Sequence, residues 1–118
     1  MDLSETLDVP KIIGSPLCIA AENAQKIFGR LKSLLESGKT VTLSFHGVTM
    51  LIPLFLNVAV GQLYGSFSGE EIRSRLRVEG LYPEDRELLK HALENAEKYH
   101  ANPDAYDAAW EMVVEGEI

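Results

Sequence analysis

The segment "TMLIPLFLNVAVGQLYG", residues 49–65, is almost wholly apolar, yet it contains a proline and an asparagine. Within it, the run from Met50 to Val60 carries one strongly polar side chain, that of Asn57. A helix that spans a bilayer needs roughly 20 apolar residues. The run ends at Gly61, before that length is reached, so the pattern predicts a buried element of a soluble fold rather than a membrane segment.

The residues around this segment predict a strand, a loop and then a helix. "VTLSF", residues 41–45, alternates apolar and hydroxyl side chains, which is typical of a strand with one apolar face. Pro53 suits the first turn of a helix, where a backbone N–H has no partner within the helix. The helix is apolar nearly all round as far as Gly65, which predicts burial on several sides or packing against a partner. Asn57 is interpreted as a satisfied amide in the core, with contact to a partner as the other interpretation.

The N-terminal third predicts a short strand followed by a long helix. Residues 9–13, "VPKII", have the composition of a strand, and their proline suits a sheet edge or a strand start. Apolar residues then recur at helical spacing over residues 17–35 and predict a single buried stripe. The helix begins either at the Ser-Pro pair 15–16 or nearer Ala20. Gly38 supplies the left-handed residue that commonly ends a helix.

The C-terminal half predicts a strand and two helices. Three arginines alternate with other residues over 73–77 and predict a strand with a basic face, although the first of these residues also fit a helical turn. Pro83 opens a helix with acids in its first turn, where the helix dipole favours them. Asn102–Pro103 ends that helix and begins another. Strands that alternate with helices predict an α/β fold, with a small, mainly parallel or mixed sheet and helices packed on it, in one domain over residues 1–118.

Charge and cysteine content limit the class of partner and the compartment. The net charge is −7, and residues 70–118 carry 13 acids against six bases. Such an acidic half disfavours binding to a phosphate backbone, so we expect no nucleic-acid partner. The single cysteine, Cys18, excludes an internal disulfide and fits a reducing compartment. The N-terminus has no secretory pattern, and we expect a cytoplasmic protein that does not bind membranes.

No group of side chains has the spacing of a catalytic or metal site. Glu87, His91 and Glu94 lie on adjacent helical turns, but a solvated face with paired charges explains this spacing better than a metal site does. Cys18 has no partner base nearby in the sequence and is more typical of a small buried residue than of a nucleophile. Phosphate-loop, dinucleotide-binding and nucleophile-elbow motifs are all missing. We therefore expect no enzyme activity, no metal and no cofactor.

Two stretches of the sequence carry a family resemblance. "SFHGV", residues 44–48, is similar to the phrase that ends an apolar strand in STAS-like domains. Leu54, Phe55 and Asn57 match the residues that follow at the helix start in those domains. "LRVEGLYPEDRELLKHALENAEKY", residues 76–99, is similar to their next strand and long helix. The chain thus resembles STAS-like domains, in particular a bacterial STAS-like family of unknown function.

One departure from the better-known relatives concerns regulation. Anti-sigma-factor antagonists, to which STAS-like domains are related, are switched by phosphorylation of a serine at this helix start. The equivalent positions here look like residues 52–55, Ile-Pro-Leu-Phe, and none of them carries a hydroxyl. Thr49 is the nearest substitute and lies before the helix start. The resemblance therefore implies a domain whose switch is lost, moved or unnecessary.

By resemblance, the chain is a non-enzymatic, regulatory protein-interaction module. Its implied partner is a histidine-kinase-type ATPase or another regulator, with a homodimer as a further option. The alternative is a small-ligand-binding α/β domain that uses the strand-to-helix mouth at residues 46–57. An exposed apolar patch at residues 50–56 would favour the first, and a closed pocket lined by Asn57 and Arg77 the second. The residues expected to bind the partner are His46, Thr49, Pro53, Leu54, Phe55 and Asn57.

Overall fold

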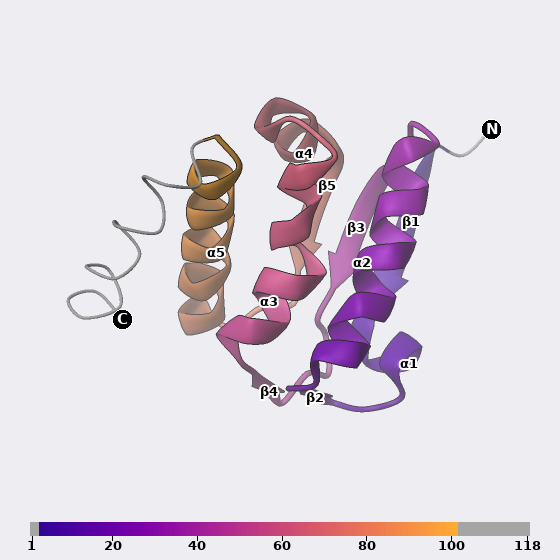
Figure 1. Cartoon of the computed structure of the whole chain (residues 1–118). Coiled ribbons are helices and arrows are strands. Elements are labelled where there is room, and N and C mark those ends of the chain that lie inside the picture. Colours follow the sequence, from indigo (N-terminus) through magenta and orange to yellow (C-terminus); the bar gives the residue numbers. More distant parts are fainter. Residues whose placement is uncertain (1–2, 102–118) are drawn as a thin grey trace.

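The computed structural model describes residues 3–101 of the chain. Within that range, five strands, five α-helices and one short 3-10 helix follow one another (Figure 1). Their bounds are β1 Ser4–Asp8, α1 Val9–Ile13, β2 Leu17–Cys18, α2 Ala21–Glu36, β3 Thr40–Ser44, β4 Met50–Leu51, α3 Pro53–Ala59, the 3-10 helix η1 Gly61–Gly65, α4 Gly69–Arg75, β5 Leu76–Glu79 and α5 Pro83–Ala101.

Three strands form one parallel sheet in the order β1-β3-β5. In its register Thr6 lies beside Thr42, and Thr42 lies beside Arg77. Parallel neighbours need a crossover, and a helix lies within each connection between neighbouring strands. The predicted α/β fold, with a small parallel sheet and helices packed on it, is confirmed.

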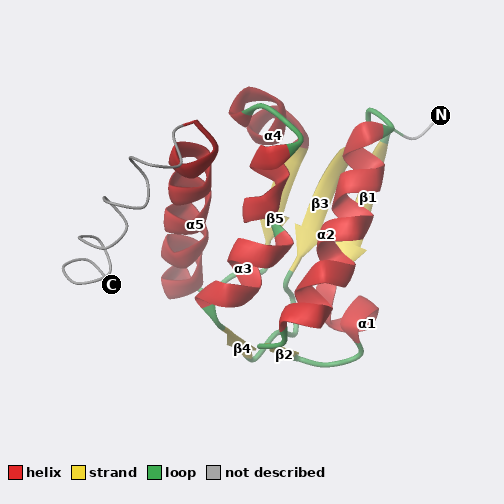
Figure 2. Ribbon diagram, in the orientation of Figure 1, coloured by secondary structure: helices red, strands yellow, loops and turns green. Residues whose placement is uncertain are grey.

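Helices α2 and α3 lie on one side of this sheet, and α5 packs on α3 and η1 beyond them (Figure 2). The sheet residues alternate accordingly. Leu7, Val41 and Leu43 are buried and face the helices. Thr6 and Arg77, at the intervening positions, are exposed on the other face. The helices therefore cover the apolar face of the sheet and leave its polar face turned away from them.

The core lies between α2, α3 and the sheet. The predicted apolar stripe of α2 is confirmed, since Ala24, Ile27, Leu31 and Leu35 are all buried. They face α3, against which α2 packs, and Phe55 of α3 is completely buried. Burial of such side chains is the main favourable term in folding, and it fixes the position of α3 relative to the sheet.

The prediction of a strand at residues 9–13 is wrong, because these residues form the helix α1. The first strand is the preceding segment, β1. The carboxylate of Asp8 accepts a hydrogen bond from the backbone N–H of Lys11 at 3.4 Å and caps the helix, and the following proline lies in its first turn. Gly14, in the left-handed conformation, then ends it after five residues. The cap and the proline outweigh the strand propensity of valine and isoleucine.

The long helix begins at the later of its two candidate starts. Ala20 is the N-cap of α2, and Leu17 belongs to the strand β2 rather than to the helix. The predicted role of Gly38 is confirmed, because its φ of +83° is left-handed and follows the C-cap Ser37. The backbone N–H of Gly38 donates to the carbonyl of Leu35 at 3.0 Å.

The three alternating arginines do not lie on one strand. Residues 69–75 form α4, so Arg73 and Arg75 are helical, and only the third arginine lies on β5. A capping box starts α4, in which Ser68 and Glu71 each bond the other's backbone N–H. The alternative of an initial helical turn is therefore confirmed and extended to seven residues.

The opening apolar stretch is divided into a strand and two helices. Met50 and Leu51 form β4, Pro53 starts α3 as predicted, and η1 completes the stretch to Gly65. No helix in the described part of the chain is both long and apolar enough to cross a membrane. The helix predicted after Asn102–Pro103 lies outside the described residues, and α5 begins at Pro83 as predicted.

Candidate functional site

The connection from β3 to α3, residues 45–52, forms a second, two-stranded sheet with the segment before α2. In this ribbon Leu17 lies beside Met50, and Cys18 lies beside Leu51. Backbone N–H groups of the connection donate to carbonyls of the other segment at 2.8 Å (Thr49 to Pro16) and at 3.2 Å (Ile52 to Cys18). Figure 1 shows the ribbon at the end of the molecule where α2 and α3 begin.

The ribbon has a buried face and an exposed apolar face. Cys18 and Leu51 point into the core, whereas Leu17, Ile19 and Met50 are 39%, 42% and 54% exposed. Successive side chains of a strand point to opposite faces, which explains the alternation. Leu54, in the first turn of α3, follows the ribbon along the chain and is 50% exposed. We call Leu17, Ile19, Met50 and Leu54 the apolar patch.

The structure separates the six residues expected to bind a partner. His46, Thr49, Pro53, Leu54 and Asn57 are exposed, as a binding surface requires. Phe55 is completely buried in the core, so this residue is not available to a partner. Successive side chains of an α-helix point about 100° apart around its axis. Phe55 therefore points inward, on the side of α3 that packs against α2, although its neighbour Leu54 is exposed.

Asn57 is not the core amide that was favoured from the sequence, because it is exposed. Pro53, Leu54 and Asn57 lie three to four residues apart on the outward face of α3. The amide of Asn57 makes no side-chain hydrogen bond within residues 3–101. It therefore offers free donors and an acceptor beside the apolar patch.

The start of α3 has no side-chain cap. Ile52 is the N-cap, and its side chain cannot accept a hydrogen bond from the first helical turn. The nearest hydroxyl, that of Thr49, donates to the carbonyl of Pro16 at 3.4 Å and so faces the ribbon. None of the residues from Ile52 to Phe55 carries a hydroxyl group.

Cys18 is fully buried on the inner face of the ribbon. Burial raises the pKa of its thiol from the usual 9.0 to about 11, and the negative charge of Asp85 adds to the shift. A thiol with so high a pKa is almost entirely protonated at neutral pH, and the thiolate is the nucleophilic form. The interpretation of Cys18 as a small buried residue is confirmed.

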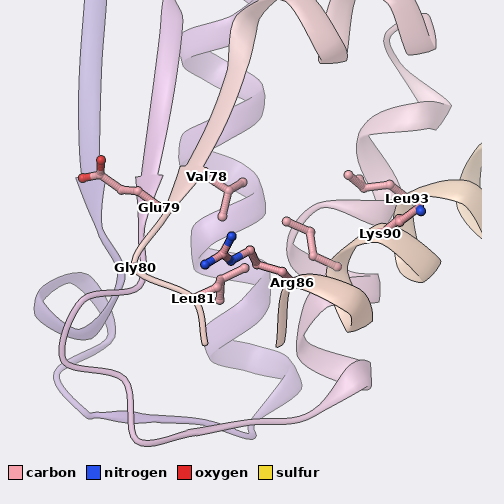
Figure 3. A pocket seen from close by; sticks show the side chains of 8 residues that line it. Val78, Glu79, Gly80, Leu81, Arg86, Lys90 and Leu93 are labelled. Atoms are coloured by element: carbon pink, nitrogen blue, oxygen red, sulfur yellow. The ribbon is translucent and has the colours of Figure 1, made fainter. Parts of the chain in front are cut away.

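A cavity of about 460 Å³ lies at the other strand-to-helix junction, where β5 passes into α5 (Figure 3). It does not include Asn57 or Arg77, so it is not the pocket that the ligand-binding alternative requires at residues 46–57. Sequence reasoning missed this cavity. The only sign of it in the sequence is the spacing of apolar and basic residues near the start of α5. The lining residues are Val78, Glu79, Gly80, Leu81, Arg86, Leu89, Lys90 and Leu93.

At Gly80 the backbones of the two junctions approach each other closely. Its φ is +82°, which disfavours other residues. A Cβ atom placed on it would lie 2.5 Å from the backbone nitrogen of His46 and 3.0 Å from the carbonyl carbon of Phe45. Only a residue without a side chain allows the end of β5 to approach the end of β3 so closely. The position of the exposed His46 is thus set partly by β5.

No cluster of three or more potential metal ligands occurs among residues 3–101. Glu87, His91 and Glu94 are exposed on α5. Elsewhere on the molecule, charged side chains form surface pairs such as Arg73 with Glu97 at 3.2 Å. Such exposed pairs contribute little to stability.

Comparison with protein-family models places residues 23–86, more than half of the chain, in the STAS-like domain of unknown function (DUF4325). The match runs from the start of α2 to the first turn of α5 and includes β3, β4, α3 and β5. Met50 and Leu54 of the apolar patch lie inside it, whereas Leu17 and Ile19 lie before it. Searches of curated proteins and of solved structures found no match.

Proposed function

The chain belongs to this family of STAS-like domains of unknown function, and from that premise we propose that it is a non-enzymatic module that binds a protein partner through the apolar patch. In this proposal the role is regulatory. The partner is a histidine-kinase-type ATPase or another regulator, as the resemblance to anti-sigma-factor antagonists suggests. The same surface suits a second copy of the chain, which would make a homodimer.

The observation that carries the proposal is the exposed apolar surface at the ribbon and the helix start. Leu17, Met50 and Leu54 are between 39% and 54% exposed, although each lies next to a completely or largely buried neighbour. Single exposed apolar residues are ordinary, but a group of them on adjacent segments is typical of an interaction site. Met50 adds an adaptable side chain, because methionine is unbranched and flexible.

The patch is not required to hold α3 in place. Phe55, Leu56 and Ala59 already anchor that helix to the core from its inner side. Leu54 lies on the outer side and keeps half of its surface exposed. Its apolar surface is therefore free to contribute to binding, where apolar anchors near the centre of an interface can each contribute about 2 kcal/mol or more.

Polar side chains occur on the same junction as this apolar patch. The Asn57 amide and the His46 ring are exposed, and within residues 3–101 neither side chain has a hydrogen-bond partner. An apolar centre with a polar rim is the usual composition of a protein interface. The absence of a hydroxyl from residues 52–55 supports a constitutive contact at this helix start rather than one switched by phosphorylation there.

The alternative, a small-ligand site in the mouth at residues 46–57, has less support. The residues of that mouth are mostly exposed, and Phe55 fills the core instead of lining a pocket. The exposed surface at residues 46–57 suits a protein partner better than a small ligand, which needs an enclosed pocket.

A charge substitution in the patch tests the proposal. Leu54→Asp should abolish self-association, or binding to the regulators encoded by neighbouring genes, as measured by sedimentation and calorimetry. The free energy of unfolding should stay within about 1 kcal/mol of the parent, as for other surface changes.

Leu3→Asp is the matched control, because Leu3 is also exposed but lies just before the start of β1, at the opposite end of that strand from the ribbon. It should leave association unchanged. If Leu54→Asp instead unfolds the domain, the patch belongs to the core and the proposal fails. Unchanged association in a folded Leu54→Asp protein would equally contradict it.

A further inference from the structure

The cavity between β5 and α5 has the size of a small-molecule site. Its volume is about 460 Å³, and ligand sites in proteins span roughly 300–1,000 Å³. It lies at the carboxyl end of β5, where the chain leaves the sheet through Gly80 and turns into α5. Open α/β sheets commonly bind ligands outside the carboxyl ends of their strands.

The walls of the cavity are mainly apolar. β5 and the turn after it contribute Val78 and Leu81, and α5 contributes Leu89 and Leu93. Three of these four side chains are only partly buried, so each keeps apolar surface that a ligand could cover. The stabilisation from covering it grows with the apolar area removed from water. The walls therefore suit an aliphatic chain.

Arg86 and Lys90 both line the cavity, and one of these two cations faces Val78 and Leu81. Figure 3 shows the guanidinium of Arg86 turned toward Val78 and Leu81, whereas the ammonium of Lys90 points away from them. Figure 3 also shows the carboxylate of Glu79 directed to the other side of the strand. Within residues 3–101, the side chain of Arg86 forms no ion pair or hydrogen bond. Its charge remains available to a ligand.

From this arrangement we propose that the cavity binds a small monocarboxylic acid with an aliphatic chain. The chain lies against Val78, Leu81, Leu89 and Leu93, and the carboxylate bonds the guanidinium of Arg86. The planar fork of arginine matches a carboxylate in two parallel hydrogen bonds. One inward cation pairs with one negative charge, which favours a carboxylate over a dianionic phosphate. This site is separate from the apolar patch, so it stands or falls independently of the proposed partner binding.

Octanoate is a suitable probe of the full-length protein. Calorimetric titration should show saturable binding of one octanoate per chain, and 1-octanol should bind at least about 10-fold more weakly because it lacks the charge. Amide chemical shifts in the NMR spectrum should change over residues 78–93. Shift changes confined to the apolar patch, at residues 17–19 and 50–54, would overturn the assignment of the site.

Two variants on α5 isolate the role of the cation. Arg86→Gln should weaken octanoate binding about 10-fold and leave octanol binding unchanged. Lys98→Gln, an exposed change on the same helix outside the cavity, should alter neither. The absence of saturable binding, or equal affinities of the parent and Arg86→Gln for octanoate, would refute the proposal. Tighter binding of octyl phosphate than of octanoate would refute the choice of a carboxylate.

Discussion

The two strand-to-helix junctions of this domain start alike and present different surfaces. Each leaves the carboxyl end of a parallel strand, and each enters a helix whose first residue is a proline, Pro53 or Pro83. The first connection, residues 45–52, is long enough to include β4 and pair with β2. The second, residues 80–82, is a short turn beside a cavity. The longer connection creates an apolar ribbon on the surface, and the shorter one leaves a hollow between strand and helix.

The largest expected effect concerns the two sides of the first junction. Phe55→Ala should cost about 3–5 kcal/mol in the free energy of unfolding, because it removes a fully buried aromatic ring and leaves a cavity. Leu54→Ala, one residue away, should cost less than about 0.5 kcal/mol, as surface changes do. Urea unfolding of the two variants measures the difference. Similar costs for both would mean that the junction has no free outer face.

The next effect tests the link between the junctions. Gly80→Ala should cost about 3 kcal/mol, since it combines left-handed strain with a clash against the backbone of His46. Gly14→Ala is the matched control, because Gly14 has a similar φ of +73° and nothing within 4 Å of the added Cβ atom. It should cost only about 1–2 kcal/mol. Equal costs, measured by urea unfolding, would show that the two junctions do not meet at Gly80.

The smallest effect concerns Cys18, on the inner face of the ribbon. Its folded pKa, about 11, lies above its usual 9.0, so the folded state holds the proton more tightly. Its contribution to stability is therefore complete below pH 9 and is lost as the pH rises toward 11. Between these values the parent should lose more stability than Cys18→Ala, as measured by urea unfolding at a series of pH values. Parallel losses in the two proteins would show that the thiol is not buried.

Sequence patterns predicted the long elements because their periodicity repeats over several turns. The stripe of α2 places four buried side chains on one face between Ala24 and Leu35, and tertiary contacts only reinforce it. The strand β3 was equally clear, because Val41 and Leu43 alternate with threonines. In these elements local pattern and tertiary packing agree.

Short elements were mispredicted because their structure depends on distant residues. The strands β2 and β4 have two residues each, too few for a period, and each exists because it pairs with the other. At residues 9–13 the cap from Asp8 and the proline in the first turn decided between strand and helix. The exposure of Asn57 depends on which side of α3 meets α2, which its own sequence does not specify. The cavity is likewise formed by residues from two elements that meet only in the fold.

The strand order β1-β3-β5 also has a consequence for how the domain assembles during synthesis. Each new strand of this sheet joins the edge formed by the strand before it, so no strand has to insert between two that are already paired. The sheet can therefore grow in the order in which the ribosome releases the chain, with β1 and β3 pairing around α2 before β5 emerges. Domains with contacts between elements close in sequence fold faster than those that need distant pairings. Nascent chains that end after β3 should accordingly already protect the amides of α2 from hydrogen exchange.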